Sequence, residues 1–256
     1  MTLTEEQKKR YHRHLILENM GEWGQEKMSR ARILVIGAGG LGSPAIFYLA
    51  ASGIGTIGIA DPDTVSISNL QRQILYTTDD IGEKKALIAE KRARALNPTI
   101  TTRSYECAVD ETNIHRIMEV YDFVIDGTDS FRAKFLINDA CVSMKKPFVH
   151  GGVHAYEGQV MTVLPGQSAC YRCVFQSPPP RGVNEPETLG VLSPLPGILG
   201  AIQATEAIKF VIGKGELLTN RLFVFDARNL TSRIVPVKRR QKCRACQLSS
   251  GESHVE

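Results

Sequence analysis

The stretch ILVIGAGGLGSP, residues 33–44, decides the fold class of this chain. Its first four residues are apolar, as in a buried strand, and a helix of small residues follows the glycines. Gly37, Gly39 and Gly42 have the G-x-G-x-x-G spacing, which lets backbone N–H groups approach a phosphate and lets the helix pack closely on the strand. The helix also presents the positive end of its dipole to an anion. The stretch predicts a nucleotide-binding turn, although many α/β proteins use glycines only to turn from strand to helix.

Strands and helices alternate around this turn. Such alternation is typical of βαβ units in a parallel sheet with helices on both faces. The predicted strands are 33–36, 56–60, 100–105, 122–126 and 147–150, and the predicted helices are 5–20, 41–52, 83–96, 111–119 and 130–144.

The pattern changes in the second half of the chain. QVMTVLP (159–165), RLFVFDA (221–227) and TSRIVPV (231–237) alternate like half-exposed antiparallel strands. Between them lie a Pro-rich stretch, 176–190, and an apolar helix predicted over 198–212. We therefore expect a single α/β domain, Rossmann-like, with a mostly parallel sheet that is flanked by helices and extended by antiparallel strands.

Composition excludes several classes of protein. The 256 residues suffice for a full core, and 31 basic against 27 acidic residues give a net charge of only +4, which does not call for nucleic acid. No apolar run approaches the roughly 20 residues that span a bilayer. The charged N-terminus MTLTEEQKKRYHRH is not a signal peptide, so the expected location is the cytoplasm.

Polar residues after the second strand separate two kinds of nucleotide. Asp61 follows the last glycine by about 20 residues, where a carboxylate meets ribose hydroxyls, but a turn-forming role is equally common. To this point a nicotinamide dehydrogenase fits as well. Asn69, Arg72 and Gln73 follow within one short turn, and a permanently charged guanidinium suits the extra phosphate of a triphosphate.

Two further charges support the triphosphate. Lys85 can add a point charge from the next helix, with Lys84 and Lys91 as competitors. Asp126 and Asp129 come at the carboxyl end of the fourth strand, where ligands of open α/β sheets lie. A carboxylate beside a triphosphate is a natural Mg²⁺ ligand; capping of the following turn is the alternative role for Asp126, and the commoner one for an Asp at such a place.

A series of motifs resembles the ThiF/MoeB/HesA family, the bacterial relatives of the ubiquitin-activating enzymes. The resemblance runs from about Tyr11 to Cys246. The motifs that carry it occur in the same order as in the family: RYHRH, GAGGLGSP, DPDTVSISNLQRQ, GEKKA, DGTDSF, NDAC, CYRC, PGILGAIQATEAIK and CRAC. The resemblance implies an ATP-dependent adenylyltransferase that activates the C-terminal glycine of a ubiquitin-like sulfur carrier ending in Gly-Gly, for thiamine, molybdopterin or related synthesis. It also implies a helical arm at 1–30, a nucleotide-binding part at 31–165 and a zinc-bearing, carrier-binding part at 166–256.

The resemblance assigns roles to individual residues. Asp129 resembles the Mg²⁺-binding aspartate, and Arg13 resembles an arginine that reaches the site of a neighbouring protomer, which implies a homodimer. Lys85 matches the lysine that neutralises charge as pyrophosphate departs. The other residues expected at the nucleotide are Gly40, Asp61, Ser68, Asn69, Leu70, Gln71, Arg72, Gln73 and Ser130.

The cysteines point to a metal. Cys170 and Cys173 form one C-x-x-C pair, Cys243 and Cys246 form another, and four thiolates are the usual ligand set of a structural Zn²⁺. A redox C-x-x-C is the rival interpretation. The family usually carries zinc at these positions. Two other cysteines, at 107 and 141, look like small buried hydrophobes.

The chain departs from the family at three places. Many members carry a cysteine in the mobile crossover loop, where this chain has Pro186 and no cysteine from 174 to 242. We therefore expect catalysis to stop at the adenylate, with an external sulfur donor completing the reaction. Ser130 replaces a common Asn, and Lys134 stands where many members have Arg.

Three other functions compete with this hypothesis. One is an adenylating dehydratase of the same superfamily that acts on a modified tRNA base. Another is an NAD-dependent oxidoreductase, and the third is a zinc-pinned nucleic-acid binder that uses PVKRRQKCRAC, residues 236–246. The last leaves the residues behind the glycine turn without a use.

Overall fold

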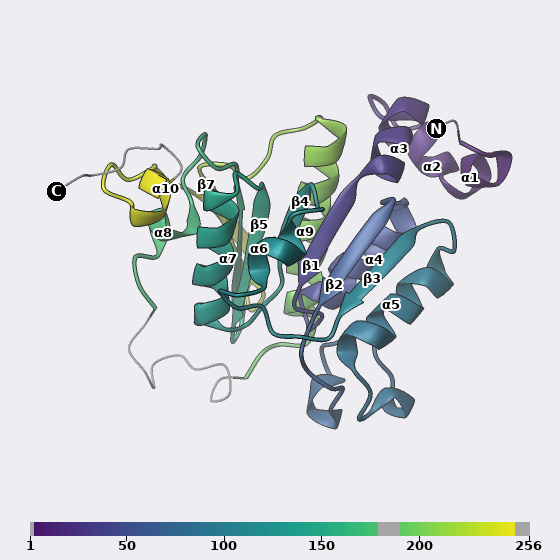
Figure 1. Ribbon diagram of the computed structural model, residues 1–256, viewed down its shortest axis with the longest axis horizontal. Coiled ribbons are helices and arrows are strands. Elements are labelled where there is room, and N and C mark those ends of the chain that lie inside the picture. Colours follow the sequence, from purple (N-terminus) through teal and green to yellow (C-terminus); the bar gives the residue numbers. More distant parts are fainter. Residues whose placement is uncertain (1–2, 179–189, 249–256) are drawn as a thin grey trace.

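One eight-stranded sheet organises the chain, in the order β3-β2-β1-β4-β5-β6-β7-β8 (Figure 1). The computed structural model describes residues 3–178 and 190–248. Strands β1 to β5 pair in parallel, and β6, β7 and β8 add to the sheet in antiparallel fashion. The strands are β1 (Arg32–Ile36), β2 (Thr56–Ala60), β3 (Thr101–Tyr105), β4 (Phe123–Asp126), β5 (Phe148–His154), β6 (Glu157–Val163), β7 (Arg221–Asp226) and β8 (Thr231–Pro236). The predicted Rossmann-like class is confirmed.

Helices cover both faces of the sheet, because successive side chains of a strand point to opposite faces. Ile33 and Val35 of β1 belong to a core shared with α4, α5 and α9, whereas Leu34 and Ile36 belong to a second core shared with α6, α7 and α8. The helices are α1 (Glu5–Arg10), α2 (His12–Leu15), α3 (Gly21–Arg30), α4 (Gly42–Ser52), α5 (Lys85–Leu96), α6 (Ile114–Met118), α7 (Phe131–Ser143), α8 (Tyr171–Val174), α9 (Pro194–Ile212) and α10 (Arg244–Leu248).

The glycine turn joins β1 to α4 as predicted. Gly37 has φ +89°, a backbone conformation that favours glycine. A Cβ atom at Gly42 would lie 1.9 Å from the carbonyl oxygen of Gly37, so no larger residue fits where helix meets strand. The chain leaves β1 towards β2 and later returns to β4 on the other side of β1. The turn therefore lies at the point where the strand order reverses, which is where open α/β sheets bind ligands.

The N-terminal arm differs from the single helix expected over 5–20. Tyr11 ends α1, and its buried side chain reaches the sheet end of the domain, where its hydroxyl lies 2.8 Å from Nδ2 of Asn97. Asn19 has a left-handed backbone with φ 64°, and the unpredicted helix α3 begins two residues later. Anchoring of one aromatic side chain therefore breaks the predicted helix into short pieces.

Element ends also shift elsewhere. The carboxylate of Asp110 accepts the N–H groups of Thr112 and Asn113, so the predicted helix 111–119 begins only at Ile114. The predicted strand 147–150 continues to His154 because it pairs with β6 in a hairpin.

Helix α9 corrects one expectation from composition. It has 19 residues with a mean hydropathy of 1.3, which is long and apolar enough to cross a membrane by length and composition. It packs instead against α4, β4, β5 and β6 as a core helix, and half of its apolar window is buried. Two of its polar residues, Gln203 and Glu206, are buried and hydrogen-bonded to the rest of the domain. A buried helix of this kind explains the high hydropathy.

Candidate active site

The predicted nucleotide residues lie at the carboxyl ends of β1, β2 and β4. The turn after β1 touches the turn after β4, since a Cβ atom at Gly37 would lie 2.8 Å from the backbone of Gly127. In Figure 1 these turns are at the lower edge of the sheet, beside the start of α5. Residues 90 positions apart in the sequence therefore share one edge of the sheet.

Asp61 ends β2 and links it to the glycine turn. Its side chain is only 4% exposed and accepts hydrogen bonds from the N–H of Ala38 at 2.7 Å and of Asp63 at 2.9 Å. Burial raises the pKa of Asp61, while these hydrogen bonds and the charge of Lys85 act in the opposite direction. Both roles considered for Asp61 are therefore compatible, because it organises the turn and remains at the strand end where a ribose would lie.

The segment 68–73 packs directly against the glycine turn. A Cβ atom at Gly40 would lie 3.1 Å from Cβ of Pro196 and 3.5 Å from Cγ of Arg72. Arg72 is half-buried and donates from Nη1 to the carbonyl of Ser68 at 3.2 Å. Gln73 is buried beside Gly39, and its Oε1 has no hydrogen-bond partner among the described residues. An arginine and an unpaired amide oxygen thus border the glycine turn.

The other residues of this segment have different positions. Ser68 and Gln71 are exposed, and the carbonyl of Gln71 accepts a hydrogen bond from Ser193 just before α9. Asn69 is half-buried and its carbonyl accepts the N–H groups of residues 72 and 73. Leu70 packs against the first core, which anchors the segment. Of these four residues, Ser68 and Gln71 therefore present their side chains most fully to solvent, and Leu70 holds the segment to the core.

Lys85 is the buried lysine among the three candidates. It is the first residue of α5 and its side chain is 5% exposed, whereas Lys84 is half-buried and Lys91 is exposed. Its Nζ lies 2.9 Å from Oδ2 of Asp63. The hydroxyl of buried Tyr76 donates to the carbonyls of Ala38 and Lys85 and so ties the glycine turn to α5. The position of Lys85 beside the glycine turn is therefore consistent with its selection from the sequence as the lysine that would face the phosphates.

Asp126 and Asp129 have opposite environments. Asp126 is buried, and its carboxylate accepts hydrogen bonds from Thr128, Lys134 and His150. Burial opposes its ionisation, but the charge of Lys134 and the hydrogen bond from His150 outweigh burial and lower the pKa to about 2. The interpretation of Asp126 as a magnesium ligand is therefore wrong, and its turn-capping alternative holds.

Asp129 and Ser130 are exposed on the turn that follows β4. Ser130 begins α7, and its hydroxyl accepts the N–H of Ala133 at 3.5 Å. Asp129 thus presents a carboxylate to solvent beside the glycine turn, as a metal ligand would require.

Arg13 is exposed on α2 and is not brought to this site. The preceding Tyr11 contacts Asn97 and Thr99, which precede β3, so the arm lies at the amino ends of the strands. Figure 1 shows α2 at the end of the sheet opposite to the turns. Arg13 therefore cannot complete the site of its own chain in this arrangement.

The four predicted metal-ligating cysteines come together. Cys170, Cys173, Cys243 and Cys246 are all buried, and their sulfur atoms lie within 4.8 Å of one another. Four sulfur pairs are separated by 3.4–3.8 Å. Thiolates bound tetrahedrally to Zn²⁺ at about 2.3 Å would be about 3.8 Å apart. The cluster has the ligands and the size for a tetrahedral metal, and it ties α10 to α8.

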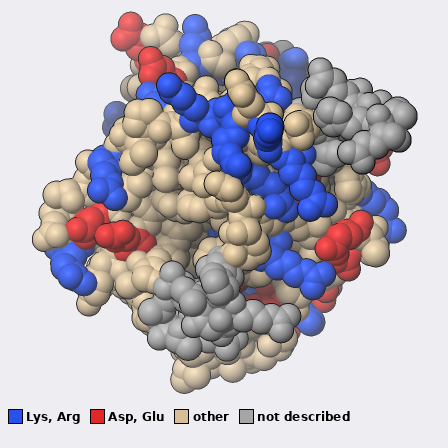
Figure 2. All heavy atoms as spheres, turned by 90° about the vertical axis from the view of Figure 1, so that its left-hand side faces the viewer, with Lys and Arg blue, Asp and Glu red and all other residues tan. Residues whose placement is uncertain are grey.

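Basic residues surround this cluster. Figure 2 shows Lys and Arg side chains gathered on the face that carries α8 and α10. Lys238, Lys242 and Arg244 are exposed, whereas Arg239 donates to the carbonyls of Gly166 and Cys246. Of the two remaining cysteines, Cys141 is buried as predicted and Cys107 is half-buried. The crossover-loop position, Pro186, lies outside the described residues.

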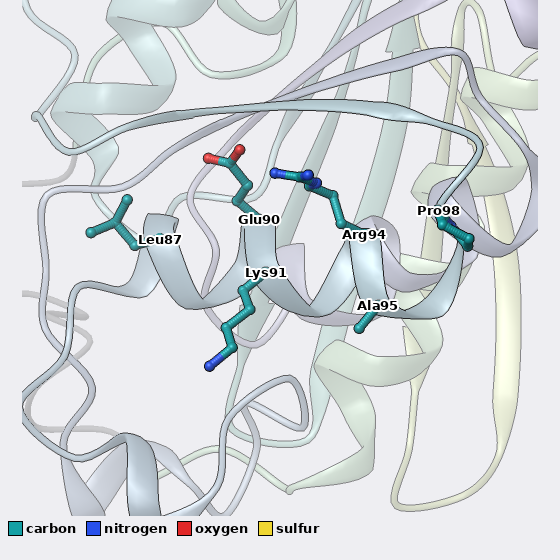
Figure 3. Close-up of a pocket in the computed structure, with 6 residues that line it drawn as sticks. All are labelled: Leu87, Glu90, Lys91, Arg94, Ala95 and Pro98. Carbon is teal, nitrogen blue, oxygen red and sulfur yellow. The ribbon is translucent and has the colours of Figure 1, made fainter.

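A hollow of about 570 Å³ lies elsewhere, on the solvent side of α5 (Figure 3). It contains no predicted site residue, although Lys91 had been a competitor of Lys85. Its lining consists of Leu87, Glu90, Lys91, Arg94, Ala95 and Pro98.

Sequence reasoning missed several residues that support the site. Asp63 could have been found from its spacing in DPD, two residues after Asp61. His150 gave no signal, and Gln203 was only an unassigned member of a family motif, because their partners lie far along the chain: Gln203 Nε2 donates to the carbonyl of Asp126 at 2.8 Å. Lys134 was noticed only as a departure from a family pattern, yet it bonds Asp126 directly.

Comparisons with known proteins agree with this geometry. The sulfur carrier protein adenylyltransferase of Thermus thermophilus is 42% identical over 252 residues, which cover 96% of this chain and 93% of that protein. The SAMP-activating enzyme E1 of Haloferax volcanii is 42% identical over 257 residues, covering 100% of this chain and 93% of the relative. A probable molybdopterin-synthase adenylyltransferase of Porphyra purpurea is 43% identical over 234 residues, 90% of this chain and 61% of its own length.

Solved structures share the fold. E. coli MccB crystallised with succinimide superposes with a TM-score of 0.83 at 24% identity, covering 95% of this chain and 74% of that one. PaaA gives a TM-score of 0.78 at 22% identity over 93% of this chain and 76% of its own. The family model described as the ThiF family matches residues 11–245. The chain therefore belongs to the ThiF family.

Proposed function

We propose that this protein is an ATP-dependent adenylyltransferase that activates the C-terminal glycine of a ubiquitin-like sulfur carrier. One observation carries the proposal: the glycine turn, Arg72 and Lys85 lie at one edge of the sheet in a chain 42% identical to a sulfur carrier protein adenylyltransferase over nearly its whole length. An NAD-dependent oxidoreductase would have no use for these two added charges.

The reaction requires positioning rather than a general base. The carrier's carboxylate is already ionised and would attack the α-phosphorus of ATP. A mixed anhydride bond between the glycine carboxyl and AMP would form, and the bond from the α-phosphorus to pyrophosphate would break. Arg72 and Lys85 would offset the charge of the phosphates, and the glycine turn with Gln73 would hold them through its polar groups. Asp61 would bind the ribose, and Ser130 would lie beside the nucleotide.

Two metals fit residues of this chain. Asp129 would hold Mg²⁺, which would neutralise phosphate charge when bound. The four cysteines would hold a structural Zn²⁺ that fastens α10 to the body of the domain. The division into an arm at 1–30, a nucleotide-binding part at 31–165 and a carrier-binding part at 166–256 belongs to the same proposal.

Arg13 would act on the neighbouring protomer of a homodimer. It is exposed, belongs to an arm at the far end of its own sheet, and carries a permanent positive charge. An arginine supplied by a partner is a known way to stabilise phosphoryl transfer. Sulfur from an external donor would then attack the acyl carbon of the adenylate, form a thiocarboxylate and release AMP, since residues 174–242 contain no cysteine to form a thioester. A cytoplasmic location follows from the same proposal.

The test is ATP–pyrophosphate exchange with purified protein, Mg²⁺ and small Gly-Gly-ended carriers. Exchange that depends on the carrier, and that disappears when its last glycine is removed, is the expected result. Lack of exchange with every such carrier, or a nicotinamide signal on mixing with NADH, would contradict the proposal.

A further inference from the structure

Lys134 occupies an unusual position for a lysine. It is the fourth residue of α7, its side chain is 6% exposed, and four oxygen atoms surround its Nζ. The Nζ lies 2.6 Å from the carbonyl oxygens of Thr128 and Gly151, and 3.3 and 3.4 Å from the two carboxylate oxygens of Asp126. A buried ammonium is costly unless it is paired and hydrogen-bonded, and here both conditions are met.

These contacts join three elements at the turn of residues 127–130, which carries the proposed metal ligand Asp129. Asp126 ends β4, Gly151 lies in β5, and Thr128 precedes Asp129 on the turn itself. Thr128 is held twice, by its carbonyl on Lys134 and by its N–H and hydroxyl on Asp126 at 3.1 and 2.7 Å. The peptide groups of Thr128, which precedes Asp129, are therefore held at both the N–H and the carbonyl oxygen.

The fixed backbone leaves little freedom to the exposed carboxylate. Asp129 itself has solvent on its side chain, while Ser130 on its other side starts α7. The same helix carries Lys134, four residues after Ser130. The side chain of Lys134 therefore links α7 back to the end of β4 and to the turn that joins them.

We propose that Lys134 is a positioning residue that holds Asp129 in place for the Mg²⁺-nucleotide. The proposal rests on the proposed function for its ligand, but the cross-link between Lys134, Asp126 and Thr128 stands independently. Groups that orient a metal ligand typically change metal affinity or activity about 10- to 100-fold when removed.

The experiment compares Lys134→Met with a matched control, Lys146→Met. Lys146 also donates to two backbone carbonyls, those of Glu119 and Tyr121, but near the amino end of the same strands. Two quantities are measured: the Mg²⁺ concentration for half-maximal exchange, and the amide hydrogen exchange of residues 127–130. We expect Lys134→Met to raise the required Mg²⁺ concentration about 10-fold or more and to speed the amide hydrogen exchange of residues 127–130. The control should change neither quantity.

Two further variants separate positioning from folding. Lys134→Arg keeps the charge and the donors and should restore most of the Mg²⁺ response. Lys134→Met combined with Asp126→Asn leaves no unpaired buried charge, so it should fold well while residues 127–130 still exchange quickly.

The outcomes are distinguishable. If the wild-type protein shows no ATP–pyrophosphate exchange, the proposed function is contradicted. The amide hydrogen exchange of residues 127–130 still decides the role of Lys134 in that case. Unchanged protection of residues 127–130 in folded Lys134→Met, or an unchanged Mg²⁺ requirement in an active enzyme, overturns the positioning role.

Discussion

The ammonium of Lys85 lies 2.9 Å from the carboxylate of Asp63, and the two groups differ sharply in exposure. The Lys85 side chain is 5% exposed, whereas that of Asp63 is 63% exposed. The N–H of Asp63 is in turn bound by Asp61 at 2.9 Å. The two residues that would meet ribose and phosphate are therefore linked through one intervening acidic residue.

Replacing Lys85 should remove charge stabilisation from the reaction. Lys85→Ala is expected to lower the rate of ATP–pyrophosphate exchange about 100-fold or more, the usual loss when one electrostatic contact to a transition state is deleted. Lys91→Ala, an exposed lysine two turns further along α5, should leave the rate unchanged. Equal rates for Lys85→Ala and wild type would remove Lys85 from the mechanism.

Two charged residues of the proposed site should matter more for activity than for folding. Arg72→Ala and Asp129→Ala are each expected to abolish exchange, because one removes the half-buried guanidinium and the other the proposed metal ligand. At the exposed Asp129 the free energy of unfolding should change by less than about 0.5 kcal/mol. Arg132→Ala, whose side chain is 82% exposed, is the control. Wild-type turnover in either site variant would refute that residue's role.

Stability should fall in mild acid because of His150. Burial, and then the charge of Lys134, lower the pKa of His150 below its ordinary value of 6.5. Below about pH 6.5 the unfolded chain therefore binds a proton at His150 that the folded chain does not bind. The free energy of unfolding decreases there by up to about 1.4 kcal/mol per pH unit.

The measurement is urea unfolding at pH 7.5 and pH 5. His150→Gln should lose part of the difference between the two free energies of unfolding, whereas His115→Gln, an exposed histidine, should keep it. Asp126 acts in the same direction at lower pH, since its pKa of about 2 lies below the usual 3.8 and its contribution is lost between these values. An identical pH dependence in His150→Gln would show that another group titrates.

The cysteine cluster should stabilise the fold before it affects chemistry. Metal analysis is expected to find about one zinc per chain, as four thiolates require. Cys170→Ser should lower the Tm by about 10 °C or more, because a loss of a few kcal/mol shifts Tm by about 2–4 °C per kcal/mol in a domain of this size. Cys107→Ser lies outside the cluster and serves as the control. Zinc-free protein with full stability would contradict the site.

A mixing experiment tests whether Arg13 acts in the partner's site. Arg13→Ala and Asp129→Ala homodimers should each be inactive. After subunit exchange in equal amounts, about a quarter of the sites would combine both intact residues and regain activity, given statistical pairing of two-fold dimers. Two Arg13→Ala preparations mixed together are the control. No recovery, with exchange of subunits verified, would exclude this arrangement.

Several features were readable from local sequence because their physics is local. The spacing of Gly37, Gly39 and Gly42 predicted the turn, since only a residue without Cβ fits at the first and the last of these positions. Apolar or alternating stretches predicted every strand of the described sheet. The arm was predicted wrongly, because Tyr11 ends α1 by inserting between Asn97 and Thr99, which lie some 86 positions away.

The sequence by itself determined the fold class and the family, and it supplied the charged residues that we propose to serve a nucleotide. Tertiary structure alone decided how the two acidic residues after β4 differ: Asp126 is buried against Lys134 and His150, and Asp129 remains open to solvent. The reason is that a carboxylate's role depends on which distant groups fold against it. His150 on β5 and Lys134 on α7 meet Asp126 only after the sheet has formed.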